Sequence, residues 1–301
     1  MAELTRREAL GAGVIALAAG LTGLAQGRGA APAQPAVAIA PQERAVKKGR
    51  LKQSVSRWCY QRIPMPDFCK AVAELGLGAI DLLEEPDWAV VRDHGLICSM
   101  GYAGGGSIAN GLNVKANHDA IVKNFEDKIP KAAAMKVPNV ITFFGNRRGM
   151  SDSEATANCV EGLNRVKAVA EANNVTICVE LLNSKVDHKD YQGDRTAFGI
   201  EIVKAVGSPR VKLLNDLYHM QIMEGDLIRT IRSGRDSFAH YHTGGVPGRH
   251  ELDATQEVQW ASVCTAIVDT GFQGYVAHEF TPSQGRDPLT SLREAVLLCD
   301  V

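Results

Sequence analysis

The sequence has almost no net charge, and this absence narrows the choice of partner. Its 33 lysines and arginines nearly balance its 34 aspartates and glutamates, which gives a formal charge of -1. Such a balance provides no electrostatic reason to expect a nucleic acid or an anionic membrane surface as the partner. With 301 residues, of which 45% are hydrophobic, the chain is long enough to form a large buried core. We therefore expect a small-molecule substrate and no nucleic-acid partner.

Cysteine is sparse and scattered. The seven cysteines are odd in number and mostly lie within apolar strand or helix patterns, so we interpret them as buried core thiols. The glycine triplet Gly104-Gly105-Gly106 is not a phosphate-binding fingerprint, because no GxGxxG register opens a helix behind it. We expect this glycine triplet to form a flexible loop after the third strand, which can act as a mobile lid.

The chain also lacks a run hydrophobic enough to be a confident membrane span. Arg6 and Arg7 precede an Ala/Gly/Leu stretch that reaches Ala25, and Ala31-Pro32-Ala33 follows as a small-residue cleavage site. This pattern resembles a twin-arginine export signal, with a membrane anchor as the alternative. Cleavage would leave a net charge of -2, because residues 1–33 carry three arginines and two glutamates. We expect a periplasmic or secreted protein with no stable membrane insertion after cleavage.

The rest of the chain divides into a linker and one large domain. Residues 34–50 are rich in Ala and Pro and then basic, which is typical of a linker. From Leu51 to the C-terminus, short β-branched runs alternate with longer amphipathic ones, the pattern of βα units around a parallel sheet. About 250 residues with eight such units predict a closed (β/α)₈ TIM barrel over residues 51–301. The predicted strands are 53–58, 79–83, 97–100, 140–144, 176–181, 211–214, 238–242 and 275–280. The predicted helices are 65–75, 119–135, 153–173, 197–206, 226–233, 255–270 and 288–299.

Four polar residues lie at or near the ends of four consecutive predicted strands, and they are Glu180, Asp216, His242 and Glu279. In a TIM barrel these strand ends meet at the mouth, so the four side chains should converge over one side of it. Three carboxylates and one imidazole favour Mn²⁺, Mg²⁺ or Co²⁺ over a thiolate-loving metal. We therefore predict a site for one divalent cation. The alternative is that each polar residue caps a strand or joins a surface ion pair.

Four motifs in the second half of the chain are specific enough to indicate a family. They are NDLYHMQIMEGDL at residues 215–227, AHYH at 239–242, VPGRHE at 246–251 and GYVAHEF at 274–280. Together they resemble the hydroxypyruvate isomerase family of xylose isomerase-like barrels, within the sugar isomerase/epimerase superfamily. The ketose 3-epimerases are close relatives of that family. The resemblance covers the chain from about Leu51 by fold pattern and is motif-specific from Glu180 to Pro282.

The resemblance implies a chemistry for the predicted cation site. It implies one divalent ion held by Glu180, Asp216, His242 and Glu279, with the two glutamates also acting as catalytic proton carriers. Moving a carbonyl to the next carbon requires one group that removes a proton and one that returns it through an enediolate. His242 departs from the classical hydroxypyruvate isomerases, which resemble one another in having glutamine there, whereas the epimerase relatives have histidine. We predict a hydroxypyruvate isomerase-like enzyme for a small keto acid or sugar, and a homo-oligomer is left open.

Further residues near these strand ends are candidates for substrate binding. His219 follows Asp216 by three residues, and its family counterpart contacts substrate in the epimerase branch. Arg249 lies in the loop after the seventh strand, where a guanidinium can hold a substrate carboxylate or hydroxyl in a forked pair. His250 and Glu251 lie beside it and are candidates for a supporting role.

The remaining candidates are weaker. Trp58 and Tyr60 close the first strand and can form an apolar wall beside a small substrate, with core packing as the alternative. We expect His240, in the strand that carries His242, to point away from the barrel interior. The charged run at residues 185–190 is typical of a solvated loop.

Other functions use the same kind of barrel. An exported sugar epimerase, or an exported lyase acting on oxidised sugars, is the alternative that suits the predicted signal. A sugar-binding barrel without turnover is a third, and the presence of both Glu180 and Glu279 argues against it. Endonuclease IV-like repair enzymes need a richer zinc cluster and a basic face, which a mature charge of about -2 disfavours.

Overall fold

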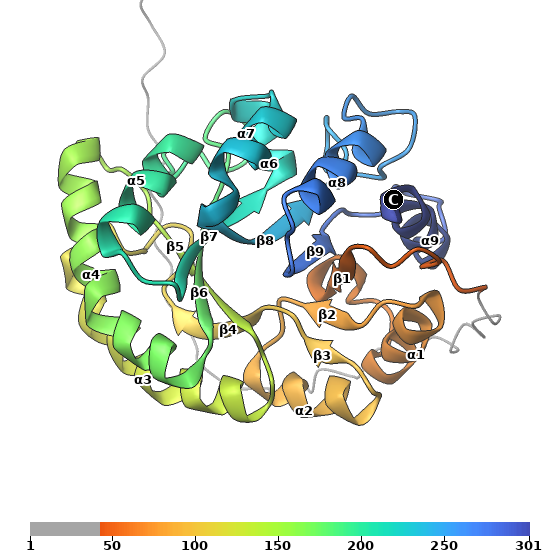
Figure 1. Ribbon diagram of the computed structural model, residues 1–301, viewed down its shortest axis with the longest axis horizontal. Helices are drawn as coiled ribbons and strands as arrows, with labels where there is room; N and C mark the ends of the chain where they lie inside the picture. Colours follow the sequence, from red (N-terminus) through yellow and green to blue (C-terminus); the bar gives the residue numbers. More distant parts are fainter. Residues whose placement is uncertain (1–42) are drawn as a thin grey trace, which may run out of the picture. The chain divides into compact units, whose positions relative to one another are not determined.

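The computed structural model describes residues 43–301, which form a ring of parallel strands with helices around the outside (Figure 1). This arrangement confirms the predicted TIM barrel. The predicted export signal and the first part of the predicted linker, residues 1–42, lie outside the described residues. The strands are β1 (Lys52–Ser56), β2 (Ala79–Asp81), β3 (Ile97–Cys98), β4 (Gly101–Gly105), β5 (Asn139–Phe143), β6 (Thr176–Leu181), β7 (Val211–Asp216), β8 (Phe238–Thr243) and β9 (Tyr275–His278).

The helices follow most of the predicted ranges. Helix α2 and the short helix α6 were not predicted, and α8 begins at Trp260 instead of residue 255. No helix in the described part of the chain has the length and hydrophobicity needed to span a bilayer. The α-helices are α1 (Met65–Leu75), α2 (Glu85–Asp93), α3 (His118–Ala134), α4 (Asp152–Asn173), α5 (Thr196–Val206), α6 (Leu217–Met223), α7 (Leu227–Gly234), α8 (Trp260–Asp269) and α9 (Pro288–Cys299). Short 3₁₀ helices are η1 (Arg57–Tyr60), η2 (Lys115–Asn117) and η3 (Arg235–Ser237).

The third strand position is occupied by two short strands, where the sequence predicts one strand over residues 97–100. The sheet order is β3-β2-β1-β9-β8-β7-β6-β5-β4, so β3 pairs with β2 and β4 pairs with β5. The two ends of the sheet meet where Leu83 forms a parallel bridge with Gly101, which also pairs with Val140 of β5. The chain therefore changes pairing partner between Cys98 and Gly101, and β4 begins directly after the predicted strand.

The glycine triplet belongs to this closure, and the expectation of a mobile lid there is wrong for Gly104 and Gly105. Both residues lie in β4, and Gly105 is buried. A Cβ atom at Gly105 would lie 2.6 Å from the Phe125 ring and 2.7 Å from the carbonyl oxygen of Ile141. Glycine is present because the backbone of β4 packs directly against α3 and β5.

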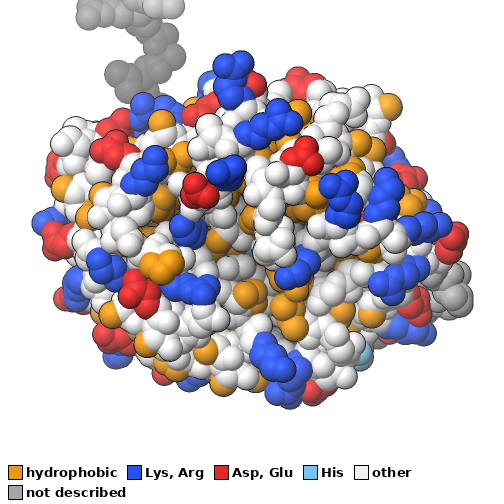
Figure 2. Space-filling model, viewed as in Figure 1, with side chains coloured by type: hydrophobic (Ala, Val, Ile, Leu, Met, Phe, Trp, Pro, Cys, Tyr) orange, Lys and Arg blue, Asp and Glu red, His pale blue; other side chains and the backbone are white. Residues whose placement is uncertain are grey.

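The core and the surface agree with the composition. All seven cysteines are free thiols, six of them buried and Cys59 half-buried, in agreement with their interpretation as core residues. On the face shown in Figure 2, acidic and basic side chains are interspersed over the surface. This distribution matches the small net charge of the chain.

Candidate metal centre

Four side chains that the sequence places at strand ends converge at the barrel mouth. Glu180 of β6, Asp216 of β7, His242 of β8 and Glu279 directly after β9 each offer a ligand atom within 4.8 Å of the others. All four are buried. The Nδ1 atom of His242 lies 2.5 Å from Oε2 of Glu279, 3.5 Å from Oε1 of Glu180 and 3.8 Å from Oδ2 of Asp216. The imidazole nitrogen therefore faces all three carboxylates.

The sheet register and a helix start hold these groups in place. Asp216 pairs directly with His242 across β7 and β8, and the amide of Glu279 donates to the carbonyl of Thr243 at 2.9 Å. Asp216 is also the N-cap of α6, because its Oδ1 accepts from the amide of His219 at 3.1 Å. The cap leaves Oδ2 directed toward the other three converging residues.

Two observations indicate that these residues fit a divalent cation. The buried Nδ1 of His242 lies close to the carboxylates but is not aligned for a hydrogen bond with any of them, although a buried polar atom normally has a partner. Arg249 contacts Asp216 and Glu279 but not Glu180, so the three buried carboxyls of the site share a single arginine. Buried charges are normally paired or coordinate a metal. The oxygen-rich donor set is one that hard divalent cations prefer.

The two glutamates have opposite electrostatic environments. Burial raises the pKa of Glu180 to about 7, and the Glu279 carboxylate adds to that rise while His242 opposes it. Burial also raises the pKa of Glu279, but Arg249 and His242 outweigh it and lower the pKa to about 2. One carboxyl thus holds a proton readily while its neighbour stays ionised.

Arg249 lies against the carboxylates, where the sequence predicts a substrate-binding residue. Its Nη2 donates to Oδ2 of Asp216 at 2.8 Å and to Oε2 of Glu279 at 2.6 Å. Its backbone φ of 57° is left-handed, a conformation that is uncommon outside glycine. The rings of Trp58 and Tyr218 flank the guanidinium at 5.7 Å and 5.0 Å. Arg249 therefore lines the site and places a positive charge against two of its carboxylates.

His219 is fully buried beside this arginine. Its Nε2 lies 2.7 Å from Nη1 of Arg249, and its Nδ1 lies 2.6 Å from Nδ2 of Asn183. Burial lowers the pKa of His219 well below its usual value, and Arg249 adds to the effect, so the ring is neutral. Asn183 was not among the predicted site residues, and nothing in the sequence around it marks it.

Trp58 reaches the centre, whereas Tyr60 does not. Trp58 lies in η1, is 39% exposed, and donates from Nε1 to Oε1 of Glu279 at 2.6 Å. Tyr60 is buried and stacks on Phe68 with ring centroids 5.2 Å apart. Of the two aromatic residues, Trp58 lies beside the site and Tyr60 packs in the core.

His250 and Glu251 lie beside Arg249 in the chain but have other partners. His250 is exposed, and its Nδ1 lies 2.8 Å from the carbonyl oxygen of Thr281. Glu251 is buried and accepts from the hydroxyls of Ser283 and Ser291 at 2.5 Å and 2.8 Å. The structure does not bring either side chain against the four converging residues, and substrate binding by His250 stays a prediction.

Two buried residues, Asp81 and His240, lie on the far side of His242, and the sequence analysis does not name Asp81. Oδ2 of Asp81, at the end of β2, lies 2.9 Å from Nε2 of His242, and Oδ1 lies 3.2 Å from Nε2 of His240. The expectation that His240 points away from the interior is wrong, because residues two apart on a strand share a face. Asp81 lies 161 positions from His242 in the chain, which is why no local motif reveals the pair.

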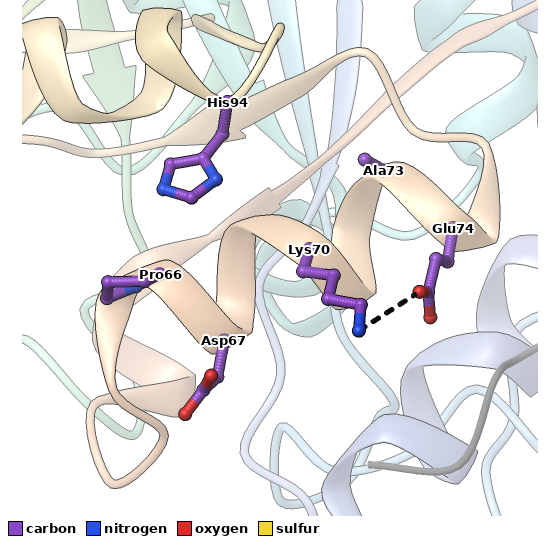
Figure 3. Close-up of a pocket in the computed structure, with 6 residues that line it drawn as sticks. All are labelled: Pro66, Asp67, Lys70, Ala73, Glu74 and His94. Carbon is purple, nitrogen blue, oxygen red and sulfur yellow. Dashed lines mark ion pairs between the residues drawn. The ribbon is translucent and has the colours of Figure 1, made fainter.

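The surface also has a cleft along α1, which is separate from the centre (Figure 3). Its volume is about 600 Å³, and its ion pair joins Lys70 to Glu74 at 3.9 Å. Exposed pairs of this kind contribute little, and the cleft has no convergent group of buried charges. The barrel mouth is therefore the better candidate. The cleft is lined by Pro66, Asp67, Lys70, Ala73, Glu74 and His94.

Comparison with known proteins yields a family match and several relatives. A family model described as a xylose isomerase-like TIM barrel matches residues 69–298. A putative hydroxypyruvate isomerase of Mus musculus is 26% identical over 174 residues, which are 56% of this chain and 63% of that protein. A 2-oxo-tetronate isomerase of Cupriavidus necator is 31% identical over 129 residues, 43% of this chain and 49% of that protein. The chain thus matches less than two thirds of the length of either relative. A D-psicose 3-epimerase of Enterocloster bolteae is 26% identical over 235 residues, 72% of each chain.

Solved structures share the fold at lower identity. An AP endonuclease of family 2 from Brucella melitensis has a TM-score of 0.72 and 21% identity, covering 80% of this chain and 97% of that one. A 3-keto-D-glucoside 4-epimerase from E. coli has a TM-score of 0.68 and 17% identity, covering 82% and 97%. The IOLI protein, whose structure holds a zinc atom, has a TM-score of 0.62 and 14% identity, covering 83% and 95%. At these identities the likeness shows the barrel fold.

Proposed function

Because the chain belongs to the xylose isomerase-like TIM barrel family, we propose that it is a metal-dependent sugar isomerase of the hydroxypyruvate isomerase type. It would move a carbonyl between adjacent carbons of a small hydroxy-keto substrate through an enediolate. Relatives named as hydroxypyruvate and 2-oxo-tetronate isomerases support this reaction class. The observation that carries the proposal is the convergence of Glu180, Asp216, His242 and Glu279 at the barrel mouth.

The residues of the centre suit this reaction. Glu180, Asp216, His242 and Glu279 would hold one divalent ion, which when bound would neutralise charge developing on two adjacent substrate oxygens. Glu279 is ionised and is suited to take a proton from the substrate carbon. Glu180 holds a proton more readily and is suited to return it to the next carbon.

The residues around the two glutamates position the substrate and the base. Trp58 donates to one oxygen of Glu279 and Arg249 to the other, which fixes the orientation of that carboxylate. The Arg249 guanidinium also places a positive charge beside the predicted position of substrate oxygens. Neutral His219 lies against Arg249 and can accept a hydrogen bond from a substrate hydroxyl if that arginine turns toward the substrate.

An epimerase on the same barrel is the second candidate. The observation that favours it is the match to a D-psicose 3-epimerase, which covers 72% of this chain and of that protein. Epimerisation at the carbon beside a carbonyl would use the same two carboxylates, because it removes and returns a proton at one carbon. A lyase acting on oxidised sugars would begin with the same proton removal. A barrel that only binds sugar has no need of two proton carriers.

The deciding experiment is a substrate screen in D₂O. The metal-loaded protein is incubated with hydroxypyruvate, small ketoses and oxidised glycosides, and the products are followed by NMR. An isomerase shifts the carbonyl and an epimerase inverts one centre, each with solvent deuterium entering carbon, whereas a lyase releases a fragment. Chelation should abolish turnover and added Mn²⁺ or Co²⁺ should restore it. Absence of any product and of deuterium incorporation from every substrate, with metal bound, would leave only the binding barrel.

A further inference from the structure

Asp81 contacts the predicted metal ligand His242 from the side opposite the carboxylates. It is the last residue of β2, pairs with Ser56 of β1, and is completely buried. Its Oδ2 atom lies 2.9 Å from Nε2 of His242, a normal hydrogen-bond distance. Its Oδ1 accepts from the hydroxyl of Ser99 at 2.6 Å and lies 3.2 Å from Nε2 of His240. Both oxygens of Asp81 are therefore engaged inside the barrel.

This contact determines which nitrogen of His242 is available to a ligand. A carboxylate accepts hydrogen bonds, so Nε2 of His242 must carry the hydrogen that points at Asp81. In the neutral ring the lone pair is then on Nδ1, which faces Glu180, Asp216 and Glu279 and has no hydrogen-bond partner. The orientation that satisfies Asp81 is the one that presents a free nitrogen to the centre.

We propose that Asp81 is a positioning residue that fixes the tautomer and the ring orientation of His242 for cation binding. The proposal rests on the proposed function, in which His242 is a ligand. Groups that hydrogen-bond the second nitrogen of a metal-binding histidine typically alter metal affinity by 10- to 100-fold. Ser99 holds the carboxylate from the other side, so that it cannot turn away from His242.

A second cation between Asp81, His240 and His242 is the competing interpretation, because these residues also lie within 4.8 Å of one another. The Ser99 hydroxyl already donates to the same carboxylate. The 2.9 Å distance between Asp81 and His242 is also that of a direct hydrogen bond. One ion bound by His242, with Asp81 hydrogen-bonded to the other nitrogen of that ring, accounts for these contacts.

The test compares Asp81→Asn with the parent protein. An asparagine amide can donate to Nε2 of His242, which would put the hydrogen on Nδ1 and block the ligand position. We expect Mn²⁺ affinity, measured by competition with a chelator, to fall roughly 10- to 100-fold. We also expect the visible spectrum of the Co²⁺-loaded protein to change, because one nitrogen ligand is lost. Asp236→Asn makes the same chemical change at a 94% exposed side chain and should leave both properties unchanged.

The outcomes separate this inference from the proposed function. If the parent protein binds no Mn²⁺ or Co²⁺, the proposed metal centre itself is wrong. If the parent binds one ion and folded Asp81→Asn binds it with equal affinity and spectrum, the positioning role is wrong. Two ions per parent chain, falling to one in Asp81→Asn, would establish the second site instead. Should Asp81→Asn fail to fold by circular dichroism, Ser99→Ala takes its place, with a smaller loss of affinity expected and unchanged affinity overturning the proposal.

Discussion

Glu180 and Glu279 differ in pKa because their neighbours differ. Arg249 and Trp58 donate to Glu279, whereas neither of them contacts Glu180 in the structure. Both carboxyls are buried, and burial raises the pKa of each. At Glu279 the charges of Arg249 and His242 outweigh this rise, whereas at Glu180 the rise prevails. A pair of carboxyls with separated pKa values is the arrangement that acid–base catalysis at neutral pH requires.

Replacing either glutamate with glutamine should therefore separate proton transfer from binding. Glu180→Gln and Glu279→Gln keep the side-chain shape but cannot exchange a proton, so turnover should drop by roughly 10²- to 10⁴-fold while substrate binding remains. Steady-state rates, metal content and deuterium uptake are measured together. Glu257→Gln, at an exposed position, is the matched control. Parent rates of deuterium exchange in both metal-loaded glutamine variants would mean that other residues carry the protons.

Arg249→Ala should have a different kinetic effect. Loss of a charged hydrogen-bond donor costs about 1.5–3 kcal/mol, so KM should rise roughly 10- to 100-fold while both proton carriers remain. A fall in kcat smaller than that of the glutamine variants is expected. The control is Arg229→Ala, whose side chain is 84% exposed. An unchanged KM with a large fall in kcat would show that Arg249 acts on the chemistry and not on substrate binding.

At the residue scale, the grouping of four side chains could be predicted because they lie at strand ends. Because parallel strands in a barrel present their C-terminal ends to one mouth, Glu180, Asp216, His242 and Glu279 could be grouped without coordinates. His240 could also have been placed in the interior, since the two-residue period puts it on the face of His242. Asp81 could not, because it lies in a three-residue strand and meets His242 only in the folded chain.

At the scale of elements, β4 shows how glycine can belong to a strand interior. The space beside Gly105 is filled by the Phe125 ring and the backbone of β5. Gly105→Ala should destabilise the protein by about 1–3 kcal/mol, because overpacking forces the neighbouring groups to shift. Urea unfolding of the metal-free protein measures this. Gly78→Ala, which has nothing within 4 Å of its added Cβ, should change stability much less, and equal losses in the two variants would contradict the packing argument.

Helix boundaries could be predicted where their signals are local. Helix α1 is followed by Gly76 in a left-handed conformation. Helix α9 begins after Asp287, whose side chain caps the helix by accepting a hydrogen bond from the amide of Thr290. Helix α6 was missed because Asp216 ends β7 and caps the helix at once, so no loop separates the two elements. The split third strand was missed because its cause is a change of pairing partner, which no local sequence pattern records.

At the scale of the whole molecule, the N-terminal sequence leads to a proposal about location. We propose that the protein leaves the cytoplasm by twin-arginine export, because Arg6 and Arg7 precede a weakly apolar stretch. Replacing both arginines with lysine should retain the protein in the cytoplasm, as measured by fractionation and immunoblotting. Replacing Arg28 with lysine is the matched control. Unchanged periplasmic yield in the double variant would count against this route.

The stability of the folded chain should depend on the cation in a pH-dependent way. The pKa of Glu180 rises on folding from 4.5 to about 7. In the metal-free protein this group therefore stabilises the fold at low pH, and its contribution is lost as pH rises from about 4.5 through about 7. Burial lowers the pKa of His242, but the carboxylates of Glu279, Asp81 and Glu180 outweigh it and raise the pKa well above its usual value. A cation must displace these protons, so its affinity should increase with pH.

The increase in Tm on adding Mn²⁺ should therefore be small near about pH 5.5 and grow toward about pH 8, since binding adds stability only to the folded state. Subtracting the Tm of the metal-free protein from that of the metal-loaded protein at each pH removes the contribution of titrating groups that the ion does not affect. Glu180→Gln removes one displaced proton, so the pH dependence of its metal-induced Tm shift should be shallower. A Tm shift of equal size across this range, measured in the parent protein at one fixed Mn²⁺ concentration, would show that Glu180 and His242 do not give up protons when the ion binds.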